Sequence, residues 1–146
     1  MLMSLCEMSN LHAKAAATLH QTAFEKSWSE QEFLNLFSLN TTKGWMDESS
    51  LLVISHVLDE IEILTILTHP NFRGQGKAKA LLEHLISYAK ENNVRQIFLE
   101  VNIENQPAIS LYEKMGFTKT GVRKNYYKMK DGLFKDALLY RLLTHI

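Results

Sequence analysis

The stretch FLEVNIENQPAISLYEKMGF, residues 98–117, decides the fold of this chain because it joins a strand directly to a capped helix. Its opening is apolar apart from one carboxylate, Glu100, and is typical of a buried strand. Asn105 can cap the helix that follows, and Pro107 is tolerated in the first helical turn. Gly116 suits the position just beyond the helix end. The stretch therefore predicts a strand, a short turn and a helix that stops at Gly116.

A glycine-rich turn and an amphipathic helix precede this unit. In FRGQGKAKALLEHLI, residues 72–86, apolar residues recur at helical spacing and define one face. Upstream, SLLVISHVL (50–58) and IEILTILT (61–68) are β-rich runs, and Asp59-Glu60 between them indicates a hairpin. A strand, a helix and another strand in this order imply a parallel pair with a right-handed crossover.

Two helices are predicted ahead of the strands. Over about residues 10–24 an apolar residue recurs at every fourth position, and these residues are Leu11, Ala15, Leu19 and Ala23. A second helix over about residues 30–38 is predicted because Ser29 and Glu32 form a capping box at its start. The two positions of a hydrophobic staple are also filled, by Trp28 and Phe33.

Two final strands, over about residues 118–127 and 136–143, flank the turn signal Asp131-Gly132. The predicted order is α α β β α β α β β, and a further short strand can precede it at the N-terminus. This is an α/β fold with a mixed sheet and helices on its faces. A length of 146 residues suits one domain, so residues 1–146 are expected to fold together.

Composition and charge favour an ordinary soluble protein. Sixteen basic residues balance sixteen acidic ones, so no overall field attracts the chain to nucleic acid or to a membrane. One cysteine, Cys6, excludes an internal disulfide and favours a reducing compartment. The first residues lack the pattern of a signal peptide. We expect a cytoplasmic protein that contacts neither nucleic acid nor membrane directly and is a monomer or weak dimer.

No metal site is predicted. The histidines are scattered, and none stands at the spacing of a metal ligand from another histidine, a cysteine or an acid. They are His12, His20, His56, His69, His84 and His145.

Several interpretations compete for the glycine turn RGQGKA, residues 73–78. In a nucleotide-triphosphate loop, Asn71 would replace the first glycine and Ala78 the hydroxyl residue that binds the metal. A dinucleotide fold is opposed by Lys79 at the third glycine position and by the short chain. The third interpretation is a pyrophosphate held by the backbone N–H groups of about Gly74 to Lys79 with help from the helix dipole. A plain solvated helix start is the remaining alternative.

The motif R-x-x-G-x-A, formed here by Arg73, Gly76 and Ala78, resembles the pyrophosphate loop of GNAT acetyltransferases, which use acetyl-CoA. The resemblance implies a GNAT acyl-CoA N-acyltransferase fold with acetyl-CoA as the cosubstrate. It also implies that the preceding strand pairs with the pantetheine arm and that Asn105 contacts CoA. The residues assigned to the cofactor are Ile66, Leu67, Thr68, Arg73, Gly74, Gln75, Gly76, Lys77, Ala78, Lys79, Asn105 and Tyr112.

A longer motif points to one subgroup within this family. L-E-V-x-x-x-N-x-x-A-I-x-L-Y-x-x-x-G-F, residues 99–117, is similar to the RimI-type ribosomal-protein alanine N-acetyltransferases. SWSEQEF (27–33) and RKNYYKMKDGLFKDALLY (123–140) resemble the same group, so the resemblance covers most of residues 24–143. It implies that the acceptor is a protein N-terminal amine, above all the alanine of a small-subunit ribosomal protein. The residues it places on the acceptor side are Trp28, Tyr126 and Tyr127.

The same stretch supplies the groups that acetyl transfer needs. Tyr112 lies seven residues after Asn105 on one helical face, so the strand acid and the helix phenol can converge. The attacking amine must be neutral, which near pH 7 costs about 1 kcal/mol for an N-terminal amine and about 5 kcal/mol for a lysine. Glu100 is the candidate base, and Tyr112 is the candidate acid for the departing thiolate. No covalent intermediate is required.

These assignments have alternatives. Glu100 is a structural carboxylate if it only pairs with Arg95 or Arg123. The other residues have structural roles available too: Tyr112 as a core aromatic, Asn105 as a simple helix cap, and Tyr126 with Tyr127 as alternating residues of an edge strand. The alternative functions are acetylation of a lysine or a small amine, and a GNAT-like module that binds CoA without catalysis.

Three features depart from the pattern of close relatives. Ser27 stands before Trp28 where proline is common, and Lys135 stands before Asp136 where an acid is common. The stretch TTKGWMDESS, residues 41–50, matches nothing expected ahead of the next strand. The first and third departures lie outside the cofactor motif, so they bear on the acceptor and leave the expected use of acetyl-CoA intact.

Overall fold

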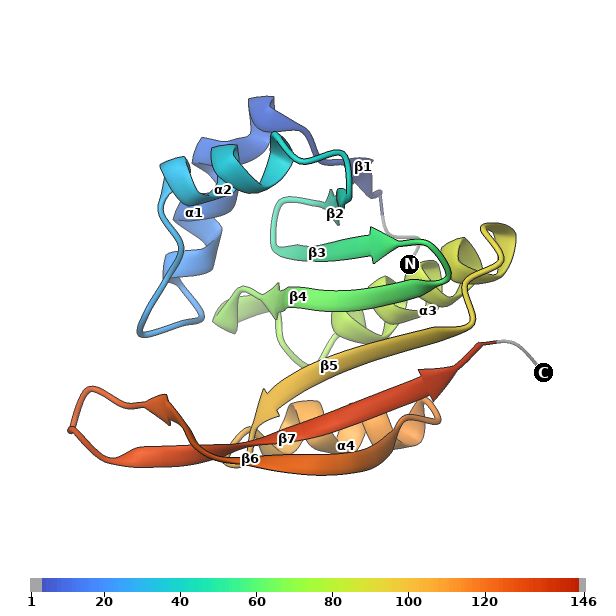
Figure 1. Ribbon diagram of the computed structural model, residues 1–146. Coiled ribbons are helices and arrows are strands. Elements are labelled where there is room, and N and C mark those ends of the chain that lie inside the picture. Colours follow the sequence, from blue (N-terminus) through green and yellow to red (C-terminus); the bar gives the residue numbers. More distant parts are fainter. Residues whose placement is uncertain (1–3, 145–146) are drawn as a thin grey trace.

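The computed structural model describes residues 4–144 and contains one seven-stranded sheet with helices on both faces (Figure 1). The strands lie in the order β1-β2-β3-β4-β5-β7-β6, and neighbours are antiparallel except for β4 and β5. Within the described residues no helix combines the length and the apolar character needed to cross a membrane. The elements are β1 (Cys6–Glu7), η1 (Asn10–His12), α1 (Ala13–Gln21), α2 (Glu30–Phe37), β2 (Thr42–Met46), β3 (Ser50–Val57), β4 (Glu60–Thr68), η2 (Pro70–Phe72), α3 (Lys77–Glu91), β5 (Gln96–Asn102), α4 (Gln106–Lys114), β6 (Thr118–Lys128) and β7 (Phe134–Leu143).

The predicted mixed sheet is confirmed. β3 and β4 form the expected hairpin, and α3 carries the chain from β4 to the parallel strand β5. β1 is the short N-terminal strand that the sequence left open. The hairpin turn lies one residue earlier than the predicted Asp59-Glu60. Leu58 has a positive φ of 56°, and Glu60 already belongs to β4, where it pairs with Val57 of β3. The turn is therefore Leu58-Asp59.

The sequence prediction missed β2, which lies in the departing stretch TTKGWMDESS. β2 pairs antiparallel with β3 along its whole length. A Cβ on Gly44 would lie 2.9 Å from the Sδ of Met8 and 3.1 Å from the carbonyl oxygen of Leu52, so close packing requires glycine here. Glycine inside a strand weakens the local β signal, which explains why the run was not predicted as a strand.

The first helix is shorter than predicted and buries a different face. Its start is the 3₁₀ turn η1, and regular α-helix begins only at Ala13. Leu11 is 88% exposed, contrary to the predicted apolar face. The residues that α1 buries are Ala13, Ala16, Leu19 and His20. The tighter 3₁₀ turn shifts the helical face relative to the every-fourth-residue pattern that begins at Leu11.

The predicted helix ends are confirmed in their hydrogen bonds. Before α2, the backbone N–H of Glu32 donates to the Ser29 hydroxyl, and the backbone N–H of Ser29 donates to the Glu32 carboxylate. After α4, Gly116 has a φ of 99°, and the N–H of Phe117 donates to the carbonyl of Tyr112 at 2.9 Å. This is a Schellman end, which fixes the direction in which the chain leaves α4.

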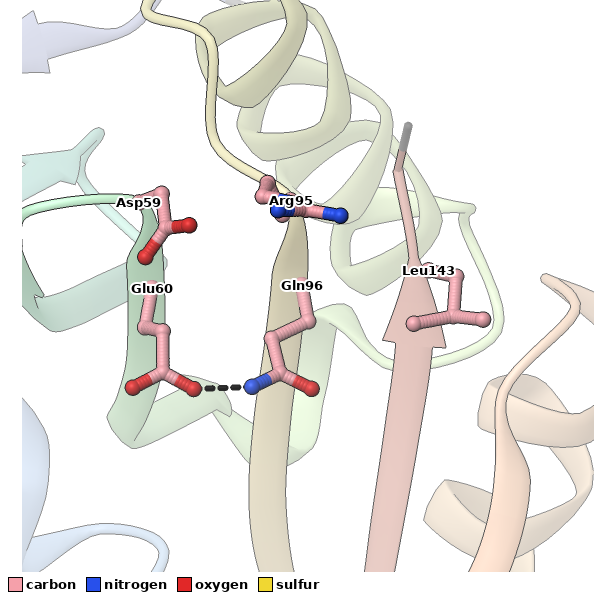
Figure 2. Close-up of a pocket in the computed structure, with 5 residues that line it drawn as sticks. All are labelled: Asp59, Glu60, Arg95, Gln96 and Leu143. Carbon is pink, nitrogen blue, oxygen red and sulfur yellow. Dashed lines mark hydrogen bonds between the residues drawn. The ribbon is translucent and has the colours of Figure 1, made fainter. Parts of the chain in front are cut away.

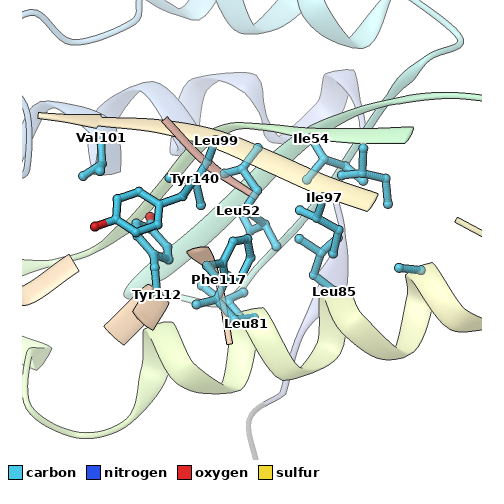
Figure 3. Packing of buried hydrophobic residues seen from close by; sticks show 14 of the residues in the cluster. Leu52, Ile54, Leu81, Leu85, Ile97, Leu99, Val101, Tyr112, Phe117 and Tyr140 are labelled. Atoms are coloured by element: carbon cyan, nitrogen blue, oxygen red, sulfur yellow. The ribbon is translucent and has the colours of Figure 1, made fainter. Parts of the chain in front are cut away.

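Two apolar cores lie on the two faces of the sheet. Alternation along β3 divides them, because Leu51 and Val53 pack with α1 and α2 while Leu52 and Ile54 pack with α3. Figure 3 shows the second core between the strands and the fully buried Leu81 of α3. The sheet is therefore supported from both sides.

β4 and β5 pair at only three positions and then part. The last parallel pair is Glu62 with Phe98. On the other edge of β4 the register with β3 shifts between Val53 and Ile54, which leaves Leu64 as an extra residue. Such a bulge bends a strand, and Figure 1 shows β4 and β5 diverging toward their C-terminal ends. Beyond Glu62 the divergence leaves the β5-facing edge of β4 open up to its end at Thr68.

His20 is a buried polar residue that joins α1 to the sheet. The N–H of Trp28 donates to its Nδ1 at 3.0 Å, so Nε2 carries the proton and faces the Thr65 hydroxyl at 3.2 Å. The imidazole stacks on Phe24 and on Trp28, with ring centroids 4.5 and 4.9 Å apart. Burial lowers the pKa of His20 from 6.5 to about 4, although Glu32 opposes the shift. The neutral ring therefore belongs to the folded state.

Folding stability should accordingly fall as the pH is lowered from 6.5 to about 4, the interval that separates the unfolded and folded pKa of His20. Only the unfolded chain takes up a proton there, so the stabilisation is complete above the interval. The loss amounts to at most about 3 kcal/mol. Urea unfolding across this pH range should show a shallower decline for His20→Gln than for the wild type. Identical declines would contradict this role.

Candidate active site

A cleft of about 520 Å³ opens where β4 ends and α3 begins. Its walls are the end of β4, the loop and first turn of α3, one side of α4 from its cap to Tyr112, and Ala23 with Phe24 after α1. All residues assigned to the cofactor from the sequence line this cleft except Gln75, which is exposed. The structure thus brings together, in one cleft, residues of three separate segments that the sequence analysis had assigned to the same cofactor.

The β4 wall of the cleft offers unpaired backbone. Ile66, Leu67 and Thr68 pair with β3 on one edge, whereas the pairing with β5 has already stopped at Glu62. The Thr68 hydroxyl is buried and has no hydrogen-bond partner within the described residues. Buried polar groups are normally satisfied, so this end of β4 is suited to a ligand that supplies partners.

The loop between β4 and α3 presents backbone amides. Gly74 and Gly76 have φ values of 79° and 78°, and a Cβ at either position would meet no atom within 4 Å. Glycine is therefore needed for the left-handed backbone and not for space. Gly76 is the N-cap of α3 and no side chain caps the helix. The free N–H groups of the first turn, together with the helix dipole, suit an anion.

The charged side chains of this loop have different surroundings. Arg73 donates from Nε to the carbonyl oxygen of Thr68 at 3.3 Å, which turns it back onto β4. Lys77 donates to the Asp47 carboxylate at 2.8 Å and is largely buried. Lys79 is exposed at the rim. The sequence could assign these residues to the loop, but it could not show that Asp47 holds Lys77.

α4 contributes Asn105 and Tyr112 to the cleft. The Asn105 side chain caps α4 by accepting from the N–H of Ala108 at 3.4 Å, which confirms its predicted capping role. Tyr112 is 5% exposed and packs against Phe117 and Tyr140. Within residues 4–144 its hydroxyl has no hydrogen bond. Burial, with a smaller contribution from Tyr127, raises the pKa of Tyr112 far above its ordinary value.

Glu100 lies on the other face of the sheet from this cleft. Its neighbours Leu99 and Val101 point into the core under α3 and α4, so alternation turns Glu100 away from that core. Its carboxylate is 20% exposed and lies 3.1 Å from the guanidinium of Arg123. Glu100 and Tyr112 therefore approach the gap between β4 and β5 from opposite faces. The pairing with Arg123 is one of the two that the sequence offered.

The sequence prediction overlooked a second carboxylate, Glu62, at the last β4–β5 pair. Burial raises the pKa of Glu62, and the neighbouring charge of Glu100 raises it further, while Arg123 lowers it. The signal was available, because Glu62 interrupts the apolar run IEILTILT as Glu100 interrupts QIFLEV. Two carboxylates and one guanidinium thus gather where the strands part.

Tyr127 lies near both Glu100 and Tyr112, since the charge of Glu100 raises the pKa of Tyr127 and Tyr127 in turn raises the pKa of Tyr112. Burial, Glu100 and Tyr126 together raise its pKa to about 12. The two tyrosines do not simply alternate on the edge strand: β6 loses its regular pairing with β7 between Arg123 and Tyr127. Asp136 stabilises this irregularity by accepting from the N–H of Asn125 at 2.9 Å. Tyr127 is consequently half-buried while Tyr126 is exposed.

Trp28, the third residue assigned to the acceptor side, does not line the cleft. Its indole is half-buried and packs edge-on against Phe33, with ring centroids 5.4 Å apart, as the predicted staple requires. The structure thus gives Trp28 a packing role beside His20.

A second hollow, of about 350 Å³, lies at the opposite, paired end of β4 and β5. Figure 2 shows its lining, in which the side chain of Gln96 donates to the carboxylate of Glu60. Arg95 belongs to this hollow, and the salt bridge of Glu100 is formed with Arg123 instead. This hollow shares no lining residue with the cleft, and its Glu60 lies two residues before Glu62 on β4.

Histidines, cysteine and acids form no cluster of three that could hold a metal ion within residues 4–144. His145, one of the six histidines considered above, lies outside the described residues. The donors that the cleft does offer are backbone N–H groups and one orphaned hydroxyl. They fit an elongated anionic ligand with amide groups, such as CoA.

Comparison with known proteins agrees with this geometry. Residues 13–117 match the acetyltransferase (GNAT) family. The [ribosomal protein bS18]-alanine N-acetyltransferase of Escherichia coli K12 is 38% identical over 136 residues, which cover 88% of each chain. The crystal structure of the ribosomal-protein-S18-alanine N-acetyltransferase from Escherichia coli superposes with a TM-score of 0.91 at 30% identity, covering 98% of this chain and 94% of that one. Arabidopsis thaliana NAA60 in complex with acetyl-CoA shares the fold, with a TM-score of 0.82 at 20% identity over 96% and 98% of the two chains.

Replacing Gly76 by alanine should weaken CoA binding about tenfold. An alanine is strained in the left-handed conformation that directs the loop amides toward the ligand. The matched control is Gly132→Ala in the β6–β7 turn, where φ is 85° and a Cβ also meets nothing within 4 Å. Both variants should lose roughly 1–2 kcal/mol of stability. Calorimetric titration with CoA should separate them, and equal affinities would contradict the assignment of the loop.

Proposed function

The chain belongs to the GNAT acetyltransferase family, and from this premise we propose that it acetylates the N-terminal α-amine of a protein. It is an N-acetyltransferase that uses acetyl-CoA. The proposed acceptor is the N-terminal alanine of a small-subunit ribosomal protein, supported by the Escherichia coli relative named for an alanine of ribosomal protein bS18. The observation that carries the mechanism is the parting of β4 and β5 beyond Glu62, which connects the cleft to the acidic group.

The cleft side of the gap binds the cofactor in this proposal. The left-handed Gly74 and Gly76 and the first turn of α3 offer N–H groups to the pyrophosphate. The open edge at Ile66 to Thr68 pairs with the amides of the pantetheine arm, as a further strand would. Acetyl-CoA, when bound, supplies the thioester carbonyl that the amine attacks. An N–H of the open edge polarises that carbonyl.

The acidic side of the gap receives the amine. An N-terminal amine has a pKa of about 7.7–8.0, so it arrives partly as a cation. Glu100 and Glu62 attract this cation, which takes the place of the Arg123 guanidinium 3.1 Å from Glu100. Glu100 then accepts the proton, directly or through a water molecule, and the neutral amine attacks the carbonyl. The C–N bond forms as the C–S bond breaks, and the nitrogen releases its second proton to solvent as the amide forms.

Tyr112 donates a hydrogen bond to the departing sulfur. Burial raises the pKa of its phenol far above 10, whereas a thiol has a pKa of about 8.5. Complete proton transfer from this phenol to a thiolate is therefore uphill, whereas a hydrogen bond to the sulfur requires no proton transfer. In this proposal Tyr112, the candidate acid of the sequence analysis, stabilises the thiolate, and solvent supplies the proton that the thiolate takes up.

A peptide with a free N-terminal alanine and one internal lysine tests the proposal. After incubation with the protein and acetyl-CoA, tandem mass spectrometry should place the acetyl group on the α-amine. Glu100→Gln should reduce the rate by about 10²–10⁴-fold, because the carboxylate no longer accepts the proton. Its binding of CoA, measured by thermal shift, should be retained.

Glu60→Gln is the matched control, since Glu60 lies two residues before Glu62 on the same strand but is bonded to Gln96 and is not part of the pair with Arg123. It should keep the wild-type rate. Acetylation of the lysine alone would overturn the proposed acceptor, and an unimpaired Glu100→Gln would overturn the proposed base. Absence of any transfer while CoA still stabilises the fold would point to a module that binds CoA without catalysis.

A further inference from the structure

Two oppositely charged side chains, largely shielded from solvent, pair where the loop enters α3. Lys77, the first residue of α3, donates from Nζ to Oδ2 of Asp47 at 2.8 Å. The two side chains are only 18% and 12% exposed. A pair this sheltered is unlike an exposed surface pair, which contributes little. Asp47 comes from the stretch between β2 and β3 that departs from the pattern of close relatives.

The two oxygens of Asp47 serve different partners. Oδ1 accepts the N–H of Ser49, the N–H of Ser50 and the hydroxyl of Ser50, each at 2.9 Å, which fixes the turn between β2 and β3. Oδ2 is left for Lys77. Burial alone would raise the pKa of Asp47, but the hydrogen bond from Lys77 and those from the two serines outweigh it and lower the pKa. Lys77, Ser49 and Ser50 therefore keep the Asp47 carboxylate ionised.

The same turn also holds the other end of the loop. The N–H of His69, the first residue after β4, donates to the carbonyl of Ser49 at 2.7 Å. Ser50 pairs with Thr68, the last residue of β4. The segment from His69 to Gly76 connects β4 to α3. Both of its ends are thus attached to the β2–β3 turn.

Between these two attachments the loop is exposed. Residues 71–76 all lie at the surface, and its glycines have open space around them. A mobile loop would have to lose backbone entropy to aim its amides at a ligand, at about 1–2 kcal/mol per residue fixed. Fixing both ends in advance reduces that loss.

We propose that Asp47 is a positioning residue for the pyrophosphate loop, acting through Lys77 and the β2–β3 turn. The proposal rests on the proposed function, since it concerns the same cofactor cleft. Lys77 is engaged by Asp47 at 2.8 Å and is therefore not a free cation awaiting phosphate. Its role is to place the start of α3, and the amides of the loop carry the contact with the pyrophosphate.

The direction in which one substitution changes the affinity for CoA distinguishes a positioning role from a simple electrostatic effect. Asp47→Asn keeps an oxygen for the two serines but removes the charge that holds Lys77. Deleting a negative charge beside an anion site, and freeing a lysine there, should tighten CoA binding if Coulomb attraction dominates. Loss of positioning should weaken it instead.

Calorimetric titration of the full chain with CoA gives the test. Asp47→Asn should bind CoA at least about fivefold more weakly, while kcat at saturating acetyl-CoA stays at the wild-type value. Asp131→Asn is the matched control, because Asp131 caps the β6–β7 turn through the N–H of Leu133 at 2.9 Å, away from the cleft. It should bind CoA as the wild type does. Unchanged or tighter binding by Asp47→Asn would overturn the proposal.

Lys77→Met provides a second variant that leaves the turn intact, should Asp47→Asn fail to fold. It should lose affinity for CoA to the same extent, and the double variant should lose no more than either single one, because both remove one contact. Additive losses, or wild-type affinity in Lys77→Met, would overturn the role of the pair. A wild-type protein that binds no CoA would instead contradict the proposed function itself.

Discussion

The parting of β4 and β5 is the constraint on which the rest of the structure depends. Three parallel pairs, ending at Glu62 and Phe98, hold the strands together, and the extra residue Leu64 then bends β4 away. The gap gives β4 an open edge on the side of α3 and α4. On the other face it exposes Glu100 beside Arg123. One departure from regular pairing thus creates both halves of the site, one for a cofactor and one for an amine.

The surroundings of the gap explain why it stays open. Each face of the sheet has its own apolar core, so β3 and β4 are held by α1 and α2 on one side and by α3 on the other. His20 fixes α1 to β4 through Thr65, close to the bulge. On the cofactor side, Asp47 anchors the start of α3 through Lys77. These contacts place rigid elements around a short stretch of backbone whose own hydrogen bonds are incomplete.

Local chemistry is what the sequence predicted well. The capping box at Ser29 and the glycine at Gly116 act within a few residues of the helix ends they define, so pattern alone located them. Features that depend on distant residues were missed. Gly44 weakens the strand signal of β2, and the need for glycine there comes from close packing against the distant Met8. Leu64 carries no sign of the bulge, and the importance of Glu62 follows from the charge of Glu100 on another strand.

Amide hydrogen exchange, measured with and without CoA, tests the central claim most directly. If the open edge of β4 receives the cofactor as a further strand, CoA should slow exchange at Ile66 to Thr68 and at Gly74 to Lys79. The β6–β7 turn at Gly132 should exchange as before. Binding of CoA that protects the loop but leaves the end of β4 unchanged would contradict the claim, because the parted strands would then have no part in holding the cofactor.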